Sequence, residues 1–203
     1  MALSYSSLGT QHSALIETML RKQLREILTK RNPTRIQSSA RTRAAVLIPF
    51  VDHDRPHIIF TKRTDTVATH RGEICFPGGV REESDADLLQ TALRETEEEL
   101  AIPSASIEIL GSLDEIETVA SNFLVVPYVG YLKQQVPYSP NKWEVSEILE
   151  IPFEHFSNPE IFHEEKRVVE NRILPVYFYR WESHMIWGVT GRILKSLLDL
   201  MRE

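Results

Sequence analysis

The chain of 203 residues has one cysteine, no excess of positive charge and no long apolar run, and each absence excludes a class of protein. Because Cys75 is the only cysteine, neither an intrachain disulfide nor a cysteine-based zinc cluster can form. A net charge of −6 argues against a general binder of nucleic acid or anionic membrane, since such proteins normally carry a basic excess. No stretch reaches the roughly 18 consecutive apolar residues of a membrane span.

The composition is that of a globular protein. Hydrophobic residues make up 42% of the chain and charged residues 26%, which excludes disorder for most of it. The length suits one well-buried domain. The first residues, MALSYSSLGTQHS, lack the basic start and long apolar run of a secretory signal. We therefore expect a soluble cytoplasmic protein, and a homodimer is compatible with the sequence.

Hydrophobic periodicity predicts an α+β fold in which a mixed sheet is preceded by a helix from Ala14 to Lys30. Strands are expected at 44–51, 57–63, 73–76, 106–113, 123–133, 144–151, 163–169 and 174–181, with hairpins at both ends of this series. Further helices are expected at 86–101 and 187–201, with a short one in IPFEHFSNP. Pro77-Gly78-Gly79 predicts a tight turn. We divide the chain into a tail and helix at 1–35 and one domain at 36–203.

The helix at 86–101 carries an unusual run of acids. Glu95, Glu98 and Glu99 stand at i, i+3 and i+4, so their carboxylates are expected to converge on one strip, with Arg94 beside Glu98. Glu97 is expected to face solvent. The side predicted to pack on the sheet carries Leu89, Ala92, Leu93, Thr96 and Leu100.

Three converging carboxylates favour a hard cation, Mg²⁺ or Mn²⁺, over zinc, and Mg²⁺ commonly bridges to substrate phosphates. The alternative is a solvated charge run with salt bridges, which is the usual meaning of such a pattern. The two glycines just upstream favour the cation, because a turn without a Cβ brings backbone close to it.

The spacing of these residues is specific. Gly79 is followed six positions later by Asp85, and Arg94-Glu95-Thr96-Glu97-Glu98-Glu99-Leu100-Ala101-Ile102 completes the pattern. It resembles the Nudix signature, G-x5-E-x7-R-E-U-x-E-E-x-G-U, where U is a bulky aliphatic residue. Asp85 replaces the first Glu, one residue is inserted before Arg94, Thr96 replaces an aliphatic residue and Ala101 replaces the late glycine. The resemblance implies a Nudix α/β/α sandwich with its active site at residues 76–99.

A second motif, IFTKRTDTVATHRGEICFPGG, resembles that of the coenzyme A pyrophosphatase subgroup, although Ala68 stands where the motif has Arg. This resemblance implies metal-dependent hydrolysis of coenzyme A or its acyl derivatives to a phosphopantetheine product and adenosine 3′,5′-bisphosphate. Two alternatives remain open: a Nudix enzyme for ADP-ribose, a nucleotide sugar or a nucleoside triphosphate, and a Nudix module that senses a nucleotide without cutting it. A small-molecule diphosphate is the expected partner in all three, with neither nucleic acid nor membrane.

The resemblance also implies roles for individual residues. Glu95, Glu98 and Glu99 are the expected metal ligands, with Glu95, Glu98 and Arg94 as the catalytic set and Arg94 orienting a glutamate. Glu98 is the first candidate for the water-activating base, and Glu144 or Glu147 is the alternative. Asp85 is expected to cap the helix. The residues expected to contact substrate are Arg63, His70, Arg71, Gly78, Gly79 and Arg81, although a surface loop equally explains His70 and Arg71. Cys75 is expected to be a small buried residue rather than a nucleophile.

Overall fold

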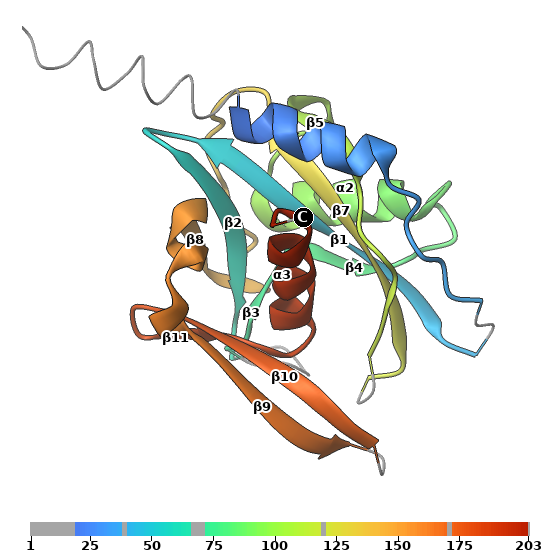
Figure 1. Cartoon of the computed structure of the whole chain (residues 1–203). Helices are drawn as coiled ribbons and strands as arrows, with labels where there is room; N and C mark the ends of the chain where they lie inside the picture. Colours follow the sequence, from blue (N-terminus) through green and yellow to red (C-terminus); the bar gives the residue numbers. More distant parts are fainter. Residues whose placement is uncertain (1–18, 38–39, 66–71, 119–120, 170–171, 203) are drawn as a thin grey trace, which may run out of the picture.

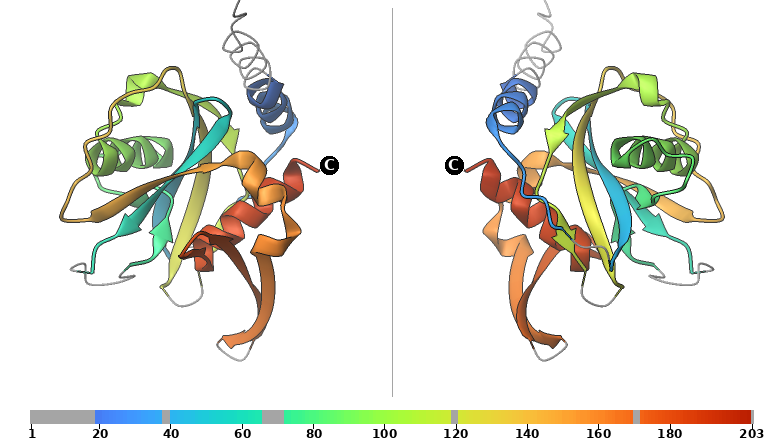
Figure 2. Two further views of the ribbon diagram at one scale, coloured as in Figure 1. Left: turned by 90° about the vertical axis from the view of Figure 1, so that its left-hand side faces the viewer. Right: turned by 90° about the vertical axis from the view of Figure 1, so that its right-hand side faces the viewer.

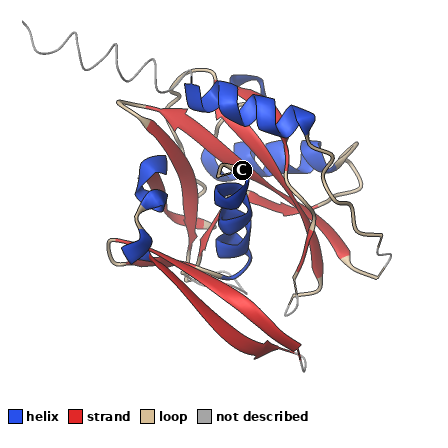
Figure 3. Cartoon of the chain, in the orientation of Figure 1, coloured by secondary structure: helices blue, strands red, loops and turns tan. Residues whose placement is uncertain are grey.

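A computed structural model describes residues 19–37, 40–65, 72–118, 121–169 and 172–202. Its strands are β1 (Thr42–Asp52), β2 (Pro56–Arg63), β3 (Ile74–Cys75), β4 (Gly78–Val80), β5 (Ile107–Ser112), β6 (Ile116–Glu117), β7 (Phe123–Leu132), β8 (Val145–Pro152), β9 (Phe162–Val169), β10 (Arg172–Trp181) and β11 (His184–Ile186). The α-helices are residues 19–30, α2 (Leu88–Leu100) and α3 (Gly188–Leu200), and short 3-10 helices are η1 (Ser104–Ser106), η2 (Phe153–Ser157) and η3 (Pro159–Ile161). Figure 3 shows these elements by type.

The main sheet is mixed, as predicted. Its strands run in the order β3-β2-β1-β7-β5, with β4 paired to β1, β6 to β7 and β8 to β2. Only the central pair β1 and β7 is parallel among the strand pairs of the described residues. β1 and β7 are buried over nearly their whole length, which explains their almost continuous apolar sequences.

Helices cover both faces of this sheet (Figure 2). Alternate residues of β1 point to opposite faces, so Leu47 joins a core with α2, while Ile48 joins a core with α3 and the N-terminal helix. The α2 side includes Ala92 and Leu100. The chain is thus an α+β protein with the α/β/α layering expected from the sequence.

The N-terminal helix is part of the core rather than an appendage. Leu24 and Leu28 are buried in the same cluster as α3. Arg21 and Arg25 pair with Glu108 of β5. Of the predicted helix 14–30, residues 14–18 lie outside the described residues, and 19–30 are helical as expected. The division of the chain into a tail and helix at 1–35 and a domain at 36–203 stays a prediction.

A second, three-stranded sheet has the order β11-β10-β9, and the predicted late hairpin forms its β9–β10 part. Figure 1 shows this hairpin extending away from the body of the molecule. Tyr179 of β10 is buried in the core that α3 shares, which anchors the base of the hairpin.

The prediction of a tight turn at Pro77-Gly78-Gly79 is wrong, because the two glycines are part of a strand. The chain bends at Pro77 and continues as β4, where Gly78 lies opposite Val46 of β1 and Gly79 opposite Ala45. A Cβ on Gly78 would lie 2.4 Å from the carbonyl oxygen of Ala45, so this strand can approach β1 only with glycine there. The sequence also gave no indication of β6 and β11, which are two and three residues long.

Candidate active site

The helix that carries the acidic run begins two residues later than predicted. Its N-cap is Asp87, whose carboxylate accepts a hydrogen bond from the Gln90 N–H at 2.8 Å. The helix ends at Ala101, which has the left-handed φ of 56° and donates its N–H to the Glu97 carbonyl. Asp85 is therefore not the cap, and the corresponding prediction is wrong.

Asp85 instead lies buried next to Arg94. Its side chain is fully buried and accepts hydrogen bonds from Arg94 Nε at 3.0 Å and Nη2 at 3.1 Å. The Thr91 hydroxyl and the Glu82 N–H each donate to the same carboxylate at 2.9 Å. The paired guanidinium holds the pKa of Asp85 well below its usual range, because these donors stabilise the charged form.

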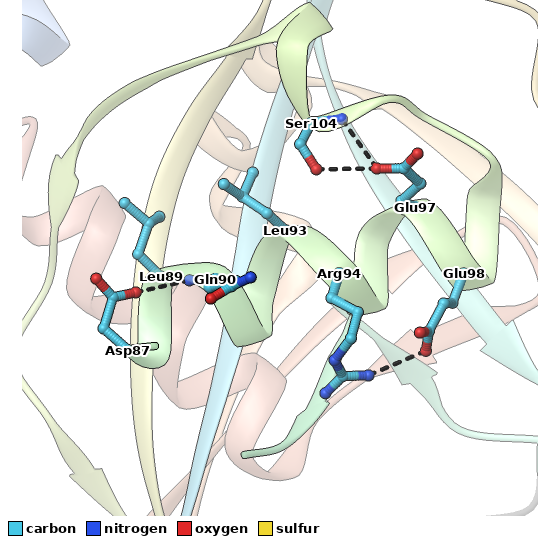
Figure 4. Close-up of a pocket in the computed structure, with 8 residues that line it drawn as sticks. All are labelled: Asp87, Leu89, Gln90, Leu93, Arg94, Glu97, Glu98 and Ser104. Atoms are coloured by element: carbon cyan, nitrogen blue, oxygen red, sulfur yellow. Dashed lines mark hydrogen bonds and ion pairs between the residues drawn. The ribbon is translucent and has the colours of Figure 1, made fainter. Parts of the chain in front are cut away.

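Arg94 presents its other edge to the acidic run. Its Nη1 donates to Glu95 Oε1 at 2.9 Å and to Glu98 Oε2 at 3.0 Å, and Nη2 reaches the Val80 carbonyl at 3.3 Å. Figure 4 shows the contact with Glu98. One guanidinium thus ties three carboxylates and β4 together, and the expected contact between Arg94 and Glu98 is confirmed.

Glu95 and Glu99 lie against the glycines of β4. A Cβ on Gly79 would fall 2.4 Å from Glu95 Oε1, so the strand backbone leaves just enough room for this carboxylate. Glu99 is 4% exposed, and its Oε2 has no hydrogen-bond partner among the described residues. Burial, reinforced by the charge of Glu95, raises the pKa of Glu99 to about 8. Burial also raises the pKa of Glu95, against the opposing effect of Arg94.

The three glutamates do not converge as predicted. The side chain of Glu98 is 57% exposed and turns to Arg94, while that of Glu95 is 17% exposed. Positions 95 and 99 share one edge of α2, whereas position 98 is rotated to the far side of position 95. Within the described part of the chain, no group of three or more His, Cys, Asp or Glu side chains is arranged to hold a metal ion.

The buried side of α2 is shifted from the one predicted. Thr91 and Glu99 are buried with Ala92, Thr96 and Leu100, whereas Leu89 and Leu93 are only half-buried. The outward face forms an open hollow of about 570 Å³ lined by Leu89, Leu93, Ser104 and polar residues of α2 (Figure 4). Glu97 is exposed as predicted, but its carboxylate accepts hydrogen bonds from the Ser104 N–H at 3.2 Å and hydroxyl at 2.9 Å.

A fourth carboxylate borders Glu95 and Glu99. Glu144 lies in the turn before β8, and its negative charge contributes to raising the pKa of both of these glutamates. Asn141 holds the turn in place, because its N–H donates to the Glu99 carbonyl at 3.0 Å and its side chain donates to Glu144 at 3.2 Å. Glu147, the other alternative base, pairs with Lys62 at 3.5 Å and His184 at 3.6 Å.

The predicted substrate-contacting residues differ in their surroundings. Arg63 has a buried Nε without a hydrogen-bond partner among the described residues, and its positive charge acts against the raised pKa of Glu99. Arg81 donates to the carbonyls of Asp85 and Ala86 at 2.9 and 3.3 Å, so the loop holds its guanidinium. His70 and Arg71 lie outside the described residues.

Cys75 is half-buried, and burial raises the pKa of its thiol to about 12. The neutral thiol of this residue is a poor nucleophile at ordinary pH, which agrees with the sequence prediction.

This donor set fits a divalent cation. Glu99, whose Oε2 has no partner within the described part of the chain, lies on the same helix edge as Glu95, and both carboxylates are hard oxygen ligands suited to Mg²⁺ or Mn²⁺. A carboxylate with a raised pKa gains from a cation, because the cation favours its charged form. Glu95 and Glu99 are therefore the residues that would hold a divalent cation on this edge of α2.

Comparison with known proteins identifies the family. Residues 40–173 match the model of the NUDIX domain. A protein of Photorhabdus laumondii subsp. laumondii named "Uncharacterized Nudix hydrolase NudL" is 35% identical over 168 residues, which cover 81% of this chain and 87% of that protein. A protein of the same name from Yersinia pestis is 36% identical over 160 residues, covering 79% of this chain and 80% of that protein.

A solved structure shares the overall fold. The crystal structure of a MutT/nudix family protein from Enterococcus faecalis matches with a TM-score of 0.53 at 12% identity, covering 100% of this chain and 76% of that one. Among the described residues, no helix is both long and apolar enough to cross a membrane.

Proposed function

The chain belongs to the Nudix hydrolase family, and we propose that it hydrolyses the diphosphate linkage of coenzyme A or an acyl-coenzyme A in a reaction that depends on Mg²⁺ or Mn²⁺. The products are a phosphopantetheine, or its acyl form, and adenosine 3′,5′-bisphosphate.

The observation that carries this proposal is the pair of Glu95 and Glu99 against β4. A buried Glu99 Oε2 that has no hydrogen-bond partner among the described residues is unfavourable, and a bound cation would remove that cost. Gly79 leaves space for the Glu95 carboxylate that no other residue would leave. These features support a binding site rather than a solvated charge run, which would expose its carboxylates.

We assign the chemistry as follows. Glu95 and Glu99 hold the cation, which supplies charge stabilisation to the phosphoryl oxygens when it is bound. Glu98 is the first candidate for the base that takes a proton from the attacking water, and Glu144 is the alternative base. Water forms a new bond to phosphorus as the bond to the bridging oxygen breaks, and the leaving phosphate carries the electron pair. Arg94, fixed by Asp85, orients Glu95 and Glu98.

We propose that positively charged side chains near Gly78 and Gly79 make the site prefer coenzyme A over other diphosphates. Coenzyme A differs from ADP-ribose by a 3′-phosphate and a pantetheine arm, and Arg63 brings positive charge to the carboxylate site. A charge-assisted contact to phosphate is worth about 1.5–3 kcal/mol, or roughly ten- to a hundredfold in kcat/KM. Ala68, which replaces the motif Arg, favours the alternative that another nucleoside diphosphate derivative is the substrate.

The test compares coenzyme A, dephospho-coenzyme A and ADP-ribose as substrates, each with Mg²⁺ and with Mn²⁺. We expect cleavage of coenzyme A with kcat/KM ten- to a hundredfold above that of dephospho-coenzyme A, by the estimate above. Faster cleavage of ADP-ribose than of coenzyme A would assign the chain to the alternative substrate class. Binding without cleavage of any diphosphate would favour a sensing module.

A further inference from the structure

The indole of Trp143 is strongly exposed to solvent. It is 82% exposed, the highest value among the large apolar side chains of the described residues, while tryptophan side chains are normally mostly buried. The residue lies in the turn before β8, a segment whose neighbouring positions are polar. A large aromatic side chain with this exposure in a polar segment is a candidate contact for a ligand.

The turn holds the backbone of Trp143 firmly. Its N–H donates to the Asn141 side chain at 3.1 Å, and its carbonyl accepts from the Thr64 hydroxyl at 2.8 Å. The Thr64 N–H donates to the next carbonyl, that of Glu144, at 2.9 Å. The backbone that carries the indole is therefore held in place by hydrogen bonds, which limits the ordering that a ligand contact requires of this turn.

The same turn borders the candidate active site on two sides. Asn141 donates its N–H to the last turn of α2 at the Glu99 carbonyl, and Thr64 directly follows Arg63 at the end of β2. Glu144, adjacent to Trp143, exerts its charge on both Glu95 and Glu99. A molecule whose phosphates lie at Glu95 and Glu99 therefore has this turn as an immediate neighbour.

We propose that the indole of Trp143 stacks on the planar base of the nucleotide part of the substrate; this inference rests on the proposed function. A nucleotide base is flat, uncharged and rich in π-electrons, so it suits the face of an indole. Stacking on an aromatic side chain tolerates any base, so Trp143 contributes affinity for the nucleotide, and the bond cleaved is determined elsewhere in the site.

The experiment measures binding of two probes that differ only by the base, adenosine 5′-monophosphate and ribose 5-phosphate, by calorimetry with Mg²⁺ present. We expect Trp143→Ala to weaken binding of adenosine 5′-monophosphate about tenfold and to leave ribose 5-phosphate unchanged. Trp143→Phe keeps an aromatic face and stays within about threefold of the wild type. Trp187→Phe is the matched control, because Trp187 stacks on Phe178 of the second sheet and its loss leaves both probes unaffected.

Equal affinity of wild type and Trp143→Ala for adenosine 5′-monophosphate overturns the proposal, as does an equal loss for both probes, which would show that the variant disturbs the turn. Thermal unfolding verifies that the variants are folded. For a diphosphate substrate that the enzyme cleaves, Trp143→Ala should raise KM about tenfold with kcat within about twofold. Since the two probes need no cleavage, failure of the proposed reaction and failure of the stacking contact are distinguished.

Discussion

Gly78 and Gly79 are adjacent in β4 but meet different neighbours. A Cβ on Gly78 would overlap the backbone of β1, at 2.4 Å from the Ala45 oxygen and 2.6 Å from the Val46 Cα. A Cβ on Gly79 would overlap only the end of the Glu95 side chain. Backbone cannot move without disrupting the sheet, whereas a glutamate side chain can rotate away. The first glycine therefore serves the fold, and the second serves the position of a carboxylate.

Alanine substitutions separate these two functions. We expect Gly78→Ala to lower the free energy of unfolding by about 2 kcal/mol or more, because the strand must shift. Gly79→Ala should change stability by less than about 1 kcal/mol but lower kcat about 10- to 100-fold, because Glu95 is displaced from its place. Urea denaturation and steady-state kinetics of both variants test this. Similar losses of stability in both would contradict the distinction.

The loop between β4 and α2 is built around the buried ion pair of Asp85 and Arg94. Asp85 holds Arg94 with two hydrogen bonds, and Arg94 in turn holds Glu95 and Glu98 of the same helix. The position of the acidic edge of α2 thus depends on a residue that precedes the helix.

Replacing Asp85 should therefore affect stability in a pH-dependent manner. Because the folded-state pKa of Asp85 is lowered, its contribution is fully present above its unfolded pKa of about 4 and is lost as the pH falls below that value. At pH 7 we expect Asp85→Asn to cost about 3 kcal/mol, and the difference from wild type to shrink towards pH 3.

Asp87→Asn is the matched control for that experiment, because asparagine caps a helix as well as aspartate does. Urea denaturation of the three proteins between pH 3 and pH 7 gives the comparison. A cost of Asp85→Asn that is small, or that is constant over this range, would contradict the role of the ion pair.

The elements differ in how far the sequence could predict them. The periodicity of residues 88–100 indicates α2 to within two residues, because a helix is a local structure. β4 could not be predicted, since Gly78 pairs with Val46, and this contact depends on the tertiary fold. The orientation of the Glu98 side chain was also not predicted. A helical wheel places its Cα on the helix surface but does not include the hydrogen bond by which Arg94 holds its carboxylate.

The whole molecule has a core on each face of the sheet, and the N-terminal helix contributes to the one opposite α2. Leu24 of this helix is fully buried. Arg21 and Arg25 of the same helix pair with Glu108 of β5, so both packing and ion pairs fix the helix on the sheet. The helix and the sheet are expected to unfold together.

Leu24→Ala tests that expectation. We predict a loss of about 2–5 kcal/mol in the free energy of unfolding, with one cooperative transition as in the wild type. The measurement is urea denaturation followed both by far-ultraviolet circular dichroism and by tryptophan fluorescence. A loss below about 1 kcal/mol, or two separate transitions, would show that the helix is not part of the same cooperative unit.

Hydrolysis is expected to depend on a cation held by Glu95 and Glu99, and the measurement is the kinetics of glutamate variants with coenzyme A as substrate. Activity should be abolished by excess chelator and restored by Mg²⁺ or Mn²⁺. Glu95→Gln and Glu99→Gln should each lower kcat at least about 10²-fold while remaining folded, since ligands to a charge-stabilising cation are worth several kcal/mol. Glu97→Gln, on the outward face, should stay within about twofold. Full activity in chelator, or a loss in Glu97→Gln as large as in Glu99→Gln, would show that Glu95 and Glu99 do not hold a catalytic cation.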